Sequence, residues 1–277
     1  MNIGIVGTGN MGTIMVEALI DGRAISPSSM IITNRTKSKA LLLKDKYKEI
    51  RVGANAEEVA SQSDLLFICV KPLDIFTMLE RINPYLSPEK CIISITSPVS
   101  TSQIEKKVSC STVRVIPSIT NRALSGVSLL TYGDNCSDHW RKKVEKLISK
   151  LSVPVCIDEN ITRVASDIVS CGPAFFSYLL QRFIQAAVKE TEIDKETATI
   201  FASEMIVGLG ELLKQGHYTL PSLQEKVCVK GGITGEGIKV LDNELGDTFE
   251  HLFQATHAKF KEDLDKVEIQ FSNLNSL

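Results

Sequence analysis

The sequence predicts an α/β domain followed by an all-α domain. Through the first half of the chain, short apolar and β-rich runs alternate with helical stretches, whereas strand signals stop after Asp158 and long helical periodicities follow. At 277 residues the chain is also longer than one common domain. We therefore expect two domains, residues 1–158 and residues 159–277.

The first domain is predicted to be a mostly parallel sheet with helices in the gaps. Its strands are expected at residues 2–6, 30–34, 64–70, 91–95, 112–116 and 154–157, and two of its helices at residues 37–48 and 137–151. In the second domain, Pro173 can open a long helix, and a similar pattern continues over residues 197–216. A final helix carries apolar residues at helical spacing: Phe249, Leu252, Phe253, Phe260 and Leu264.

A glycine-rich string follows the first strand directly and precedes a helix. This G-x-G-x-x-G string consists of Gly7, Thr8, Gly9, Asn10, Met11 and Gly12, all expected to contact a cofactor. Gly7 allows a tight turn, Gly9 lets the backbone approach a pyrophosphate, and Gly12 lets the helix pack on the strand. The α/β domain is therefore predicted to be a Rossmann-type NAD(P)-binding domain.

The end of the second predicted strand indicates which dinucleotide binds. An NAD-selective site would place Asp or Glu there to hold the ribose 2′-hydroxyl, but the chain has Asn34, Arg35 and Thr36. A guanidinium and a hydroxyl can both bond a 2′-phosphate, so NADP(H) is favoured over NAD(H). The alternative is that Arg35, with Lys37 and Lys39, is a solvated helix start.

Composition argues against several classes of function. The formal net charge is −2 and no basic stripe stands out, so we expect no nucleic-acid partner. Apolar stretches are interrupted before they reach the length a bilayer needs, which predicts no membrane partner and a cytoplasmic location. The 7 cysteines and 4 histidines are dispersed, which predicts reduced thiols and no metal site.

Several short strings are spread over nearly the whole chain: GIVGTGNMG, ITNRTKSK, Gly53-Ala54-Asn55, Cys69-Val70-Lys71-Pro72, Cys171-Gly172-Pro173-Ala174 and VCVKGGITGEGIKVL. Together they resemble the pyrroline-5-carboxylate reductases, which use NAD(P)H to make proline. This resemblance implies that Val70, Lys71 and Pro72 pass the cofactor. It also implies that Asn55 reaches the adenosine end.

The reaction that this resemblance implies needs little side-chain chemistry. A cyclic imine protonated on nitrogen is already an electrophile, so orientation and electrostatics carry hydride transfer. Thr234 matches the family's threonine beside the ring nitrogen and is the implied catalytic residue. The implied substrate-binding residues are Val229, Lys230, Gly231, Gly232, Thr234 and Gly235. Their glycines match a turn that holds the carboxylate at a helix N-terminus.

Departures from the family pattern gather around the substrate. Val229 and Lys230 replace a serine and a proline, and Ser118 replaces an asparagine. Ser97-Pro98 replaces an alanine and a glycine after the fifth strand of the pattern. An intact nucleotide site beside an altered substrate pocket is typical of a diverged relative, and the pattern most resembles a late-competence branch of the family.

Two functions therefore remain open. The first is NADPH-dependent reduction of 1-pyrroline-5-carboxylate, or a related cyclic imino acid, to L-proline or its analogue. The second is a non-catalytic NADP-binding paralogue with a regulatory role in competence or development. A hydroxyacid dehydrogenase of similar architecture is a third reading, but Lys189 and Lys195 lie too far along the helical half to supply its catalytic lysine.

The helical half carries broad apolar faces, which a second subunit often completes. We therefore expect a homodimer formed through the C-terminal helices. A small cyclic imino acid is the other expected partner.

Overall fold

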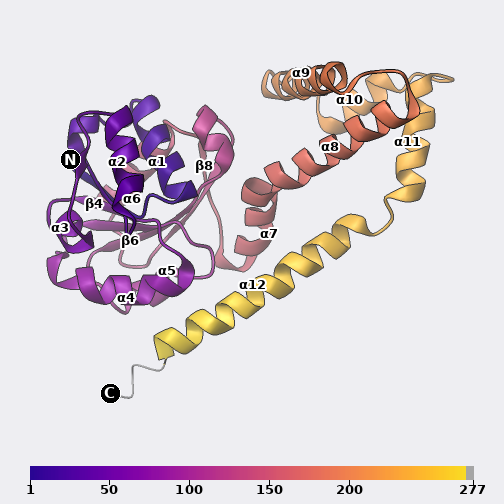
Figure 1. The fold of residues 1–277 in the computed structure, drawn as a ribbon. Coiled ribbons are helices and arrows are strands. Elements are labelled where there is room, and N and C mark those ends of the chain that lie inside the picture. The colour runs from indigo at the N-terminus through magenta and orange to yellow at the C-terminus, as the bar shows by residue number, and fades with distance from the viewer. Residues whose placement is uncertain (273–277) are drawn as a thin grey trace. The chain divides into compact units, whose positions relative to one another are not determined.

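The first half of the chain forms one sheet of eight strands (Figure 1). The strands lie in the order β3-β2-β1-β4-β5-β6-β7-β8. The computed structural model describes residues 1–272. The strands are β1 (Ile3–Val6), β2 (Met30–Thr33), β3 (Arg51–Val52), β4 (Leu65–Ile68), β5 (Cys91–Ser94), β6 (Ser111–Ile116), β7 (Val127–Tyr132) and β8 (Val153–Cys156). The strand order reverses between β1 and β4, which is the switch point of a Rossmann sheet.

The central strands are parallel and buried on both faces. Ile5 in β1 lies opposite Ile32 in β2 and Phe67 in β4, and all three side chains are fully buried. Such strands appear in a sequence as continuous apolar runs because helices cover both faces of the sheet. Every predicted strand has a counterpart in the structure, with ends that differ by no more than two residues.

Helices on the two faces bury alternate residues of the strands. The sheet helices are α1 (Asn10–Asp21), α2 (Lys37–Lys46), α3 (Ala56–Ser61), α4 (Pro72–Ile82), α5 (Thr101–Glu105) and α6 (Asp138–Ile148). Phe67 packs in one core with Leu19 of α1 and Trp140 of α6. Its neighbour Ile68 packs in the other core, with Leu79 of α4. This period of two follows from the pleat of the strands.

Two strands lie outside the predicted set. β3 has two residues, which is too short for a periodic signal. β7 is antiparallel to β6, with Leu130 opposite Val115, and it follows Gly126 at φ +76°. An antiparallel neighbour needs only a short connection, which a 3-10 helix at Ile119–Ala123 supplies here. The sheet is therefore mixed at this edge.

All regular structure after β8 in the described residues is helical, as the sequence predicts. The elements are α7 (Thr162–Ser166), a π-helical segment (Asp167–Cys171), α8 (Gly172–Glu190), α9 (Lys195–Lys214), α10 (Leu220–Val227), α11 (Ile233–Glu244) and α12 (Thr248–Ser272). Short 3-10 helices lie at Pro27–Ser29, Asn83–Tyr85 and Glu159–Ile161. None of the helices within residues 1–272 combines the length and apolar character that a membrane crossing requires.

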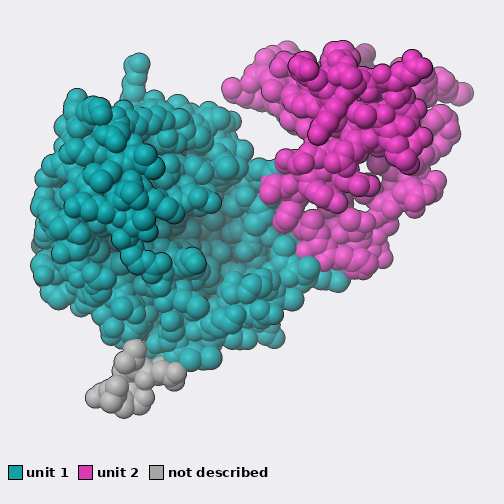
Figure 2. Space-filling model, viewed as in Figure 1, with its two compact units in different colours: residues 1–173, 253–277 teal, residues 174–252 magenta. Residues whose placement is uncertain are grey.

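The chain divides into two compact units, coloured separately in Figure 2. Unit 1 contains residues 1–173 and the segment from Phe253 onward, and unit 2 contains residues 174–252. This division differs from the boundary at residue 158 that we expect from the sequence. The helix α7, the π-helical segment and most of α12 belong to the same unit as the sheet. Phe271 of α12 packs edge-on against Phe76 of α4, with ring centroids 5.1 Å apart.

Candidate functional site

Two positions at the turn after β1 and the start of α1 leave no room for a side chain. Gly7 has φ +99°, and a side chain there would also meet the carbonyl of Cys69. A Cβ on Gly12 would overlap the carbonyl oxygen of Gly7, so this glycine permits the close packing of α1 on β1. A Cβ on Gly9 would meet nothing within 4 Å. Gly9 therefore leaves open space above the turn.

The same turn is tied to the end of β2. The backbone N–H of Thr8 donates to Oδ1 of Asn34 at 3.0 Å, and Nδ2 of Asn34 donates to the carbonyl of Thr36 at 3.0 Å. The N–H of Gly7 donates to the carbonyl of Thr33 at 2.9 Å. Both polar ends of the Asn34 amide are thus occupied within the protein. We infer that Asn34 shapes the turn.

These residues fit a dinucleotide. No side chain caps the start of α1 at Gly9, so the first N–H groups of the helix point toward the open space above that glycine. The hydroxyl oxygen of Thr8 is buried and has no partner among residues 1–272. An uncapped helix N-terminus behind a glycine turn is suited to a pyrophosphate.

Arg35 projects from the loop between β2 and α2. Its side chain is exposed, and it makes no ion pair or hydrogen bond within the described part of the chain. Thr36, which precedes α2 as its N-cap residue, is exposed and places no side-chain oxygen on the helix. A guanidinium and a hydroxyl are therefore free at the position where a ribose 2′-substituent would be read.

The other predicted cofactor residues lie at the starts of α3 and α4. Asn55 is the N-cap of α3, and its Oδ1 accepts the N–H of Glu58 at 2.8 Å. Lys71 is the exposed N-cap of α4, Pro72 is the first residue of that helix, and Val70 is half-buried. All the cofactor residues predicted from the sequence lie in unit 1.

A cavity of about 550 Å³ lies beyond the carboxyl ends of β4 and β5. Residues that follow these strands line it, together with α7, the π-helical segment and α12: Pro72, Ile95, Thr96, Ser97, Pro98, Arg163, Asp167, Cys171, Ala255, Thr256, Lys259, Phe260 and Asp263. In doubly wound sheets, ligands bind in this crevice at the carboxyl ends of the strands. All these residues belong to unit 1.

A buried ion pair forms part of the cavity wall. Nη2 of Arg163 donates to Oδ1 of Asp167 at 2.9 Å, and the hydroxyl of Thr256 donates to Oδ2 at 2.8 Å. The side chain of Asp167 is fully buried. Burial also raises the pKa of the nearby Cys171 thiol, so this sulfur stays protonated near neutral pH.

Sequence reasoning missed Arg163 and Asp167. The available signal was their i, i+4 spacing, which places opposite charges on one helix face directly before Cys171-Gly172-Pro173-Ala174. Arg114 was missed as well, because an arginine inside a β-rich run gives no sign of its partners.

Arg114 is buried in β6 and holds the loop after β5. Its Nη1 donates to the carbonyl of Ser97 at 3.2 Å, and its Nη2 donates to the hydroxyls of Thr162 at 2.8 Å and Thr131 at 3.2 Å. Burial lowers the pKa of this guanidinium, and the carboxylate of Glu159 opposes that effect. Arg114 thus connects the part of the cavity wall at Ser97 to the start of α7.

Ser118 has a structural role in unit 1. Its hydroxyl donates to the carbonyl of Val169 at 2.8 Å, and the hydroxyl of Ser170 donates to the carbonyl of Pro117 at 2.7 Å. Two hydrogen bonds therefore join the loop after β6 to the π-helical segment. The side chain of Ser118 is 1% exposed, and its hydroxyl is used in this contact between the two segments.

The predicted substrate-binding residues form one turn and helix start in unit 2. Gly231 has φ +74°, and the N–H of Gly232 donates to the carbonyl of Val229 at 2.9 Å. Helix α11 begins at Ile233 with no side-chain cap, which leaves its first N–H groups available to an anion. Thr234 is exposed in the first turn of this helix.

The remaining substrate residues flank this helix start. Val229 and Lys230 are exposed just before it, and a Cβ on Gly235 would meet nothing within 4 Å. The structure therefore brings all six predicted substrate residues together at one turn of unit 2.

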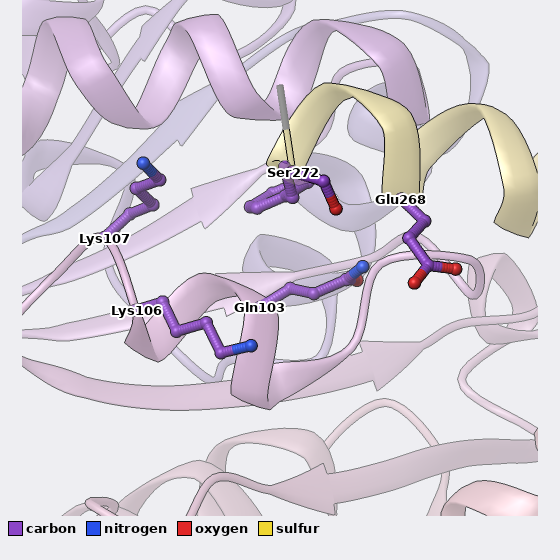
Figure 3. A pocket seen from close by; sticks show the side chains of 6 residues that line it. Gln103, Lys106, Lys107, Glu268 and Ser272 are labelled. Carbon is purple, nitrogen blue, oxygen red and sulfur yellow. The ribbon is translucent and has the colours of Figure 1, made fainter. Parts of the chain in front are cut away.

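A second cavity, of about 420 Å³, lies in unit 1 between α5 and the end of α12. Figure 3 shows Gln103 and Lys106 on one side of it and Glu268 on the other. Its lining includes none of the residues predicted to bind cofactor or substrate.

Two family models match the chain. Residues 2–98 match the family described as "NADP oxidoreductase coenzyme F420-dependent", and residues 159–263 match "Pyrroline-5-carboxylate reductase dimerisation". Both halves of the predicted architecture therefore correspond to known families, an NAD(P)-binding oxidoreductase fold and a helical dimerisation domain.

Individual relatives extend along nearly the whole chain. ComE operon protein 4 of Bacillus subtilis (strain 168) is 55% identical, covering 98% of this chain and 99% of the relative. A pyrroline-5-carboxylate reductase of Methanobrevibacter smithii is 30% identical, covering 87% and 97%. The fold resembles that of Plasmodium falciparum pyrroline carboxylate reductase with NADP bound, with a TM-score of 0.81, 22% identity and 98% of each chain covered. The chain therefore belongs to the pyrroline-5-carboxylate reductase family.

Proposed function

We propose that the protein is an NADPH-dependent reductase of 1-pyrroline-5-carboxylate or a related cyclic imino acid. The observation that carries this proposal is the exposed Thr234 at the uncapped, glycine-bounded start of α11. A hydroxyl and several free N–H groups on one turn can bind the ring nitrogen and carboxylate of such a substrate. In this proposal residues 1–158 bind the nucleotide and residues 159–277 form the helical domain.

The residues present supply binding and orientation. The turn Gly7–Gly12 would hold the pyrophosphate, with Arg35 and Thr36 at the ribose 2′-phosphate and Asn55 toward the adenosine. Bound NADPH would supply the hydride. Val70, Lys71 and Pro72 would form the wall against which the dinucleotide lies.

Substrate recognition is assigned to the turn before α11. Its backbone N–H groups and the helix dipole would stabilise the carboxylate, and Lys230 adds a positive charge beside them. The hydroxyl of Thr234 would accept a hydrogen bond from the protonated ring nitrogen. This arrangement orients an electrophile that is already activated, so a strong acid or base is not required.

A turnover assay tests this proposal. Purified full-length protein should oxidise NADPH when pyrroline-5-carboxylate is added, and faster than it oxidises NADH. Thr234→Ala should lower kcat/KM by about 10-fold or more, since a charge-assisted hydrogen bond is worth about 1.5–3 kcal/mol. Thr77→Ala, at an exposed threonine of α4, is the matched control. Full activity of the Thr234 variant would remove this residue from the mechanism.

A second function is supported by the relatives. The chain is 55% identical to ComE operon protein 4 but 29% identical to pyrroline-5-carboxylate reductase 3 of the same organism, Bacillus subtilis (strain 168). We infer from this difference, and from Val229 and Lys230, that a non-catalytic NADP-binding protein with a role in competence is the alternative. In that case NADPH should raise the melting temperature while no cyclic imine is reduced.

We also propose that two copies associate through unit 2. Apolar side chains on its helices are exposed, among them Phe176 and Phe183 at 65% each, Phe201 at 64% and Val207 at 60%. Large exposed apolar patches mark interaction surfaces, and the match to a dimerisation family supports a second copy as the partner. Light scattering should give twice the 30.4 kDa chain mass, and Phe183→Glu should shift it toward the monomer.

A further inference from the structure

The cavity of about 420 Å³ between α5 and the end of α12 has two walls of different charge. One wall, formed by α5 and the two residues after it, carries Gln103, Lys106 and Lys107. The other wall, formed by the end of α12, carries Glu268 and Ser272. Figure 3 shows the side chain of Gln103 extending toward the side on which Glu268 lies. A cationic wall thus faces an anionic one across a space that can hold a small molecule.

The charges on these walls are not neutralised by neighbouring side chains. Lys106 and Glu268 are exposed, and neither makes a side-chain ion pair or hydrogen bond within residues 1–272. Glu105, the neighbour of Lys106 in the sequence, is occupied elsewhere, because its carboxylate accepts the N–H groups of Asp134 at 3.3 Å and Asn135 at 2.9 Å. One cation and one anion are therefore available to a ligand on opposite walls.

The amide of Gln103 adds a positioned donor to the cationic wall. Its Oε1 accepts the N–H of Ser100 at 2.9 Å, and its own N–H donates to the hydroxyl of Ser100 at 3.1 Å. This capping box holds the side chain in place at the start of α5. Nε2 has no acceptor in the part of the chain that the structure describes, so it can donate to a carboxylate beside Lys106.

The floor of the cavity is aromatic. Phe271 lines it and is 9% exposed, and its ring packs edge-on against that of Phe76, with centroids 5.1 Å apart. Nζ of Lys107 lies 4.7 Å from the centre of the Phe76 ring, which keeps this second cation close to the floor. Carbon surface of this kind suits a short aliphatic group.

We propose that this cavity binds an α-amino acid with an aliphatic side chain as a zwitterion, with its carboxylate at Lys106 and Gln103 and its ammonium at Glu268. A simple anion would be repelled by Glu268, and a simple cation by the two lysines, so only a ligand with both charges is attracted by both walls. The lining contains no residue assigned to the coenzyme or the cyclic imino acid. The inference therefore does not depend on the proposed function.

Binding of three matched probes to the full chain tests the proposal without turnover. The probes are L-valine, isobutylamine, which lacks the carboxylate, and 3-methylbutanoate, which lacks the ammonium. Titration followed by the NMR signals of the ligand measures each Kd. Wild type should bind L-valine at least about 5-fold more tightly than either analogue, which is the contribution expected from one partly exposed ion pair.

Two variants should change these preferences in a crossed pattern. Lys106→Met should abolish the advantage of L-valine over isobutylamine, and Glu268→Gln should abolish its advantage over 3-methylbutanoate. Both positions are exposed, so the variants should fold as wild type does, which thermal unfolding checks. Lys143→Met and Glu145→Gln change exposed charges of α6 outside the cavity and should keep both preferences. A general loss of structure would weaken all three probes together.

The outcomes separate this inference from the proposed function. If wild type does not prefer L-valine, or if both preferences survive in Lys106→Met and Glu268→Gln, the inference is wrong even where the protein reduces cyclic imines. If Lys230→Met removes the binding of L-valine instead, the amino acid lies at the turn before α11, and the inference is again wrong. If the crossed pattern is found but no cyclic imine is reduced, the inference stands and the proposed reaction falls.

Discussion

The side-chain amide of Asn34 accepts a hydrogen bond from the backbone N–H of Thr8 at 3.0 Å. This contact joins the end of β2 to the glycine turn after β1, two segments that meet only because their strands are neighbours in the sheet. The turn that we assign to the pyrophosphate is therefore shaped by a residue 26 positions further along the chain.

Asn34→Ala should loosen this turn. The buried N–H of Thr8 would lose its acceptor, which costs about 1–3 kcal/mol of stability. We also expect weaker NADPH binding, because the turn would no longer be held in its binding conformation. Urea unfolding and fluorescence titration measure the two effects. Ser38→Ala, at an exposed position of α2, is the control, and equal behaviour of the two variants would contradict this role for Asn34.

Arg35→Ala should weaken binding of NADPH more than binding of NADH. A guanidinium that bonds a 2′-phosphate contributes about 1.5–3 kcal/mol, so the Kd for NADPH should rise about 10-fold or more. Lys39→Ala removes another exposed cation of the same segment and should change neither Kd appreciably. An equal loss of both coenzymes in Arg35→Ala would refute the assignment of NADP selectivity to this residue.

Two glycines of the turn should respond differently to alanine. Gly12→Ala places a methyl group on the carbonyl of Gly7, so it should destabilise the fold by about 1–3 kcal/mol or more, which is the usual cost of overpacking a core. Gly9→Ala meets nothing within 4 Å and should fold normally, yet its methyl group would fill the space assigned to the pyrophosphate. Thermal unfolding with and without NADPH distinguishes the two. A Gly9→Ala variant that binds NADPH normally would argue against this position for the phosphates.

The sheet was largely predictable because its central strands are buried on both faces. A run such as Leu65–Ile68 is apolar at every position, and this signal survives without knowledge of its neighbours. β7 was not predicted, because polar Ser128 and Thr131 interrupt its apolar residues. Its antiparallel direction is not contained in the apolar pattern either. β3 has two residues and its place depends on hydrogen bonds with β2. Pairing is a tertiary property that a one-dimensional pattern does not contain.

The candidate site divides in the same way. The glycine turn and the start of α11 are local motifs. Their residues are neighbours in the sequence, so they could be identified from it and lie together in the fold. The Arg163–Asp167 pair, by contrast, contacts Thr256 and Phe260, which lie about 90 positions further along the chain and cannot be identified from the i, i+4 spacing. Likewise, Phe271 packs on Phe76 because α12 returns to the sheet, a return that helical periodicity cannot predict.

Arg114→Met should destabilise unit 1. The variant removes a 3% exposed guanidinium and leaves the carbonyl of Ser97 and the hydroxyl of Thr162 without their donors. The cost should be about 2–4 kcal/mol, measured by urea unfolding. Glu159→Gln should cost less than about 1 kcal/mol, because Glu159 is half-exposed and lies 3.6 Å from Arg114. If the two variants were equally destabilised, the hydrogen bonds of Arg114 would not be the source of the effect.

Stability should depend on pH through Cys110, which is 1% exposed in the core beneath α5. Burial raises its pKa to about 12 from an ordinary value of 9.0. The folded state therefore holds this proton more tightly than the unfolded chain does. The resulting stabilisation is fully present below about pH 9 and is lost as the pH rises toward 12, at up to about 1.4 kcal/mol per pH unit.

Cys110→Ala separates this effect from the titration of other groups. Between pH 8 and pH 10.5, the free energy of unfolding of wild type should fall more steeply than that of the variant, and the gap between them should narrow by about 1–2 kcal/mol. Cys156→Ala removes an exposed thiol and should keep the wild-type slope. Urea unfolding at several pH values measures all three proteins. If the free energy of unfolding fell equally with pH in wild type and Cys110→Ala, the prediction would be wrong. The thiol would then have the same pKa in the folded and the unfolded chain.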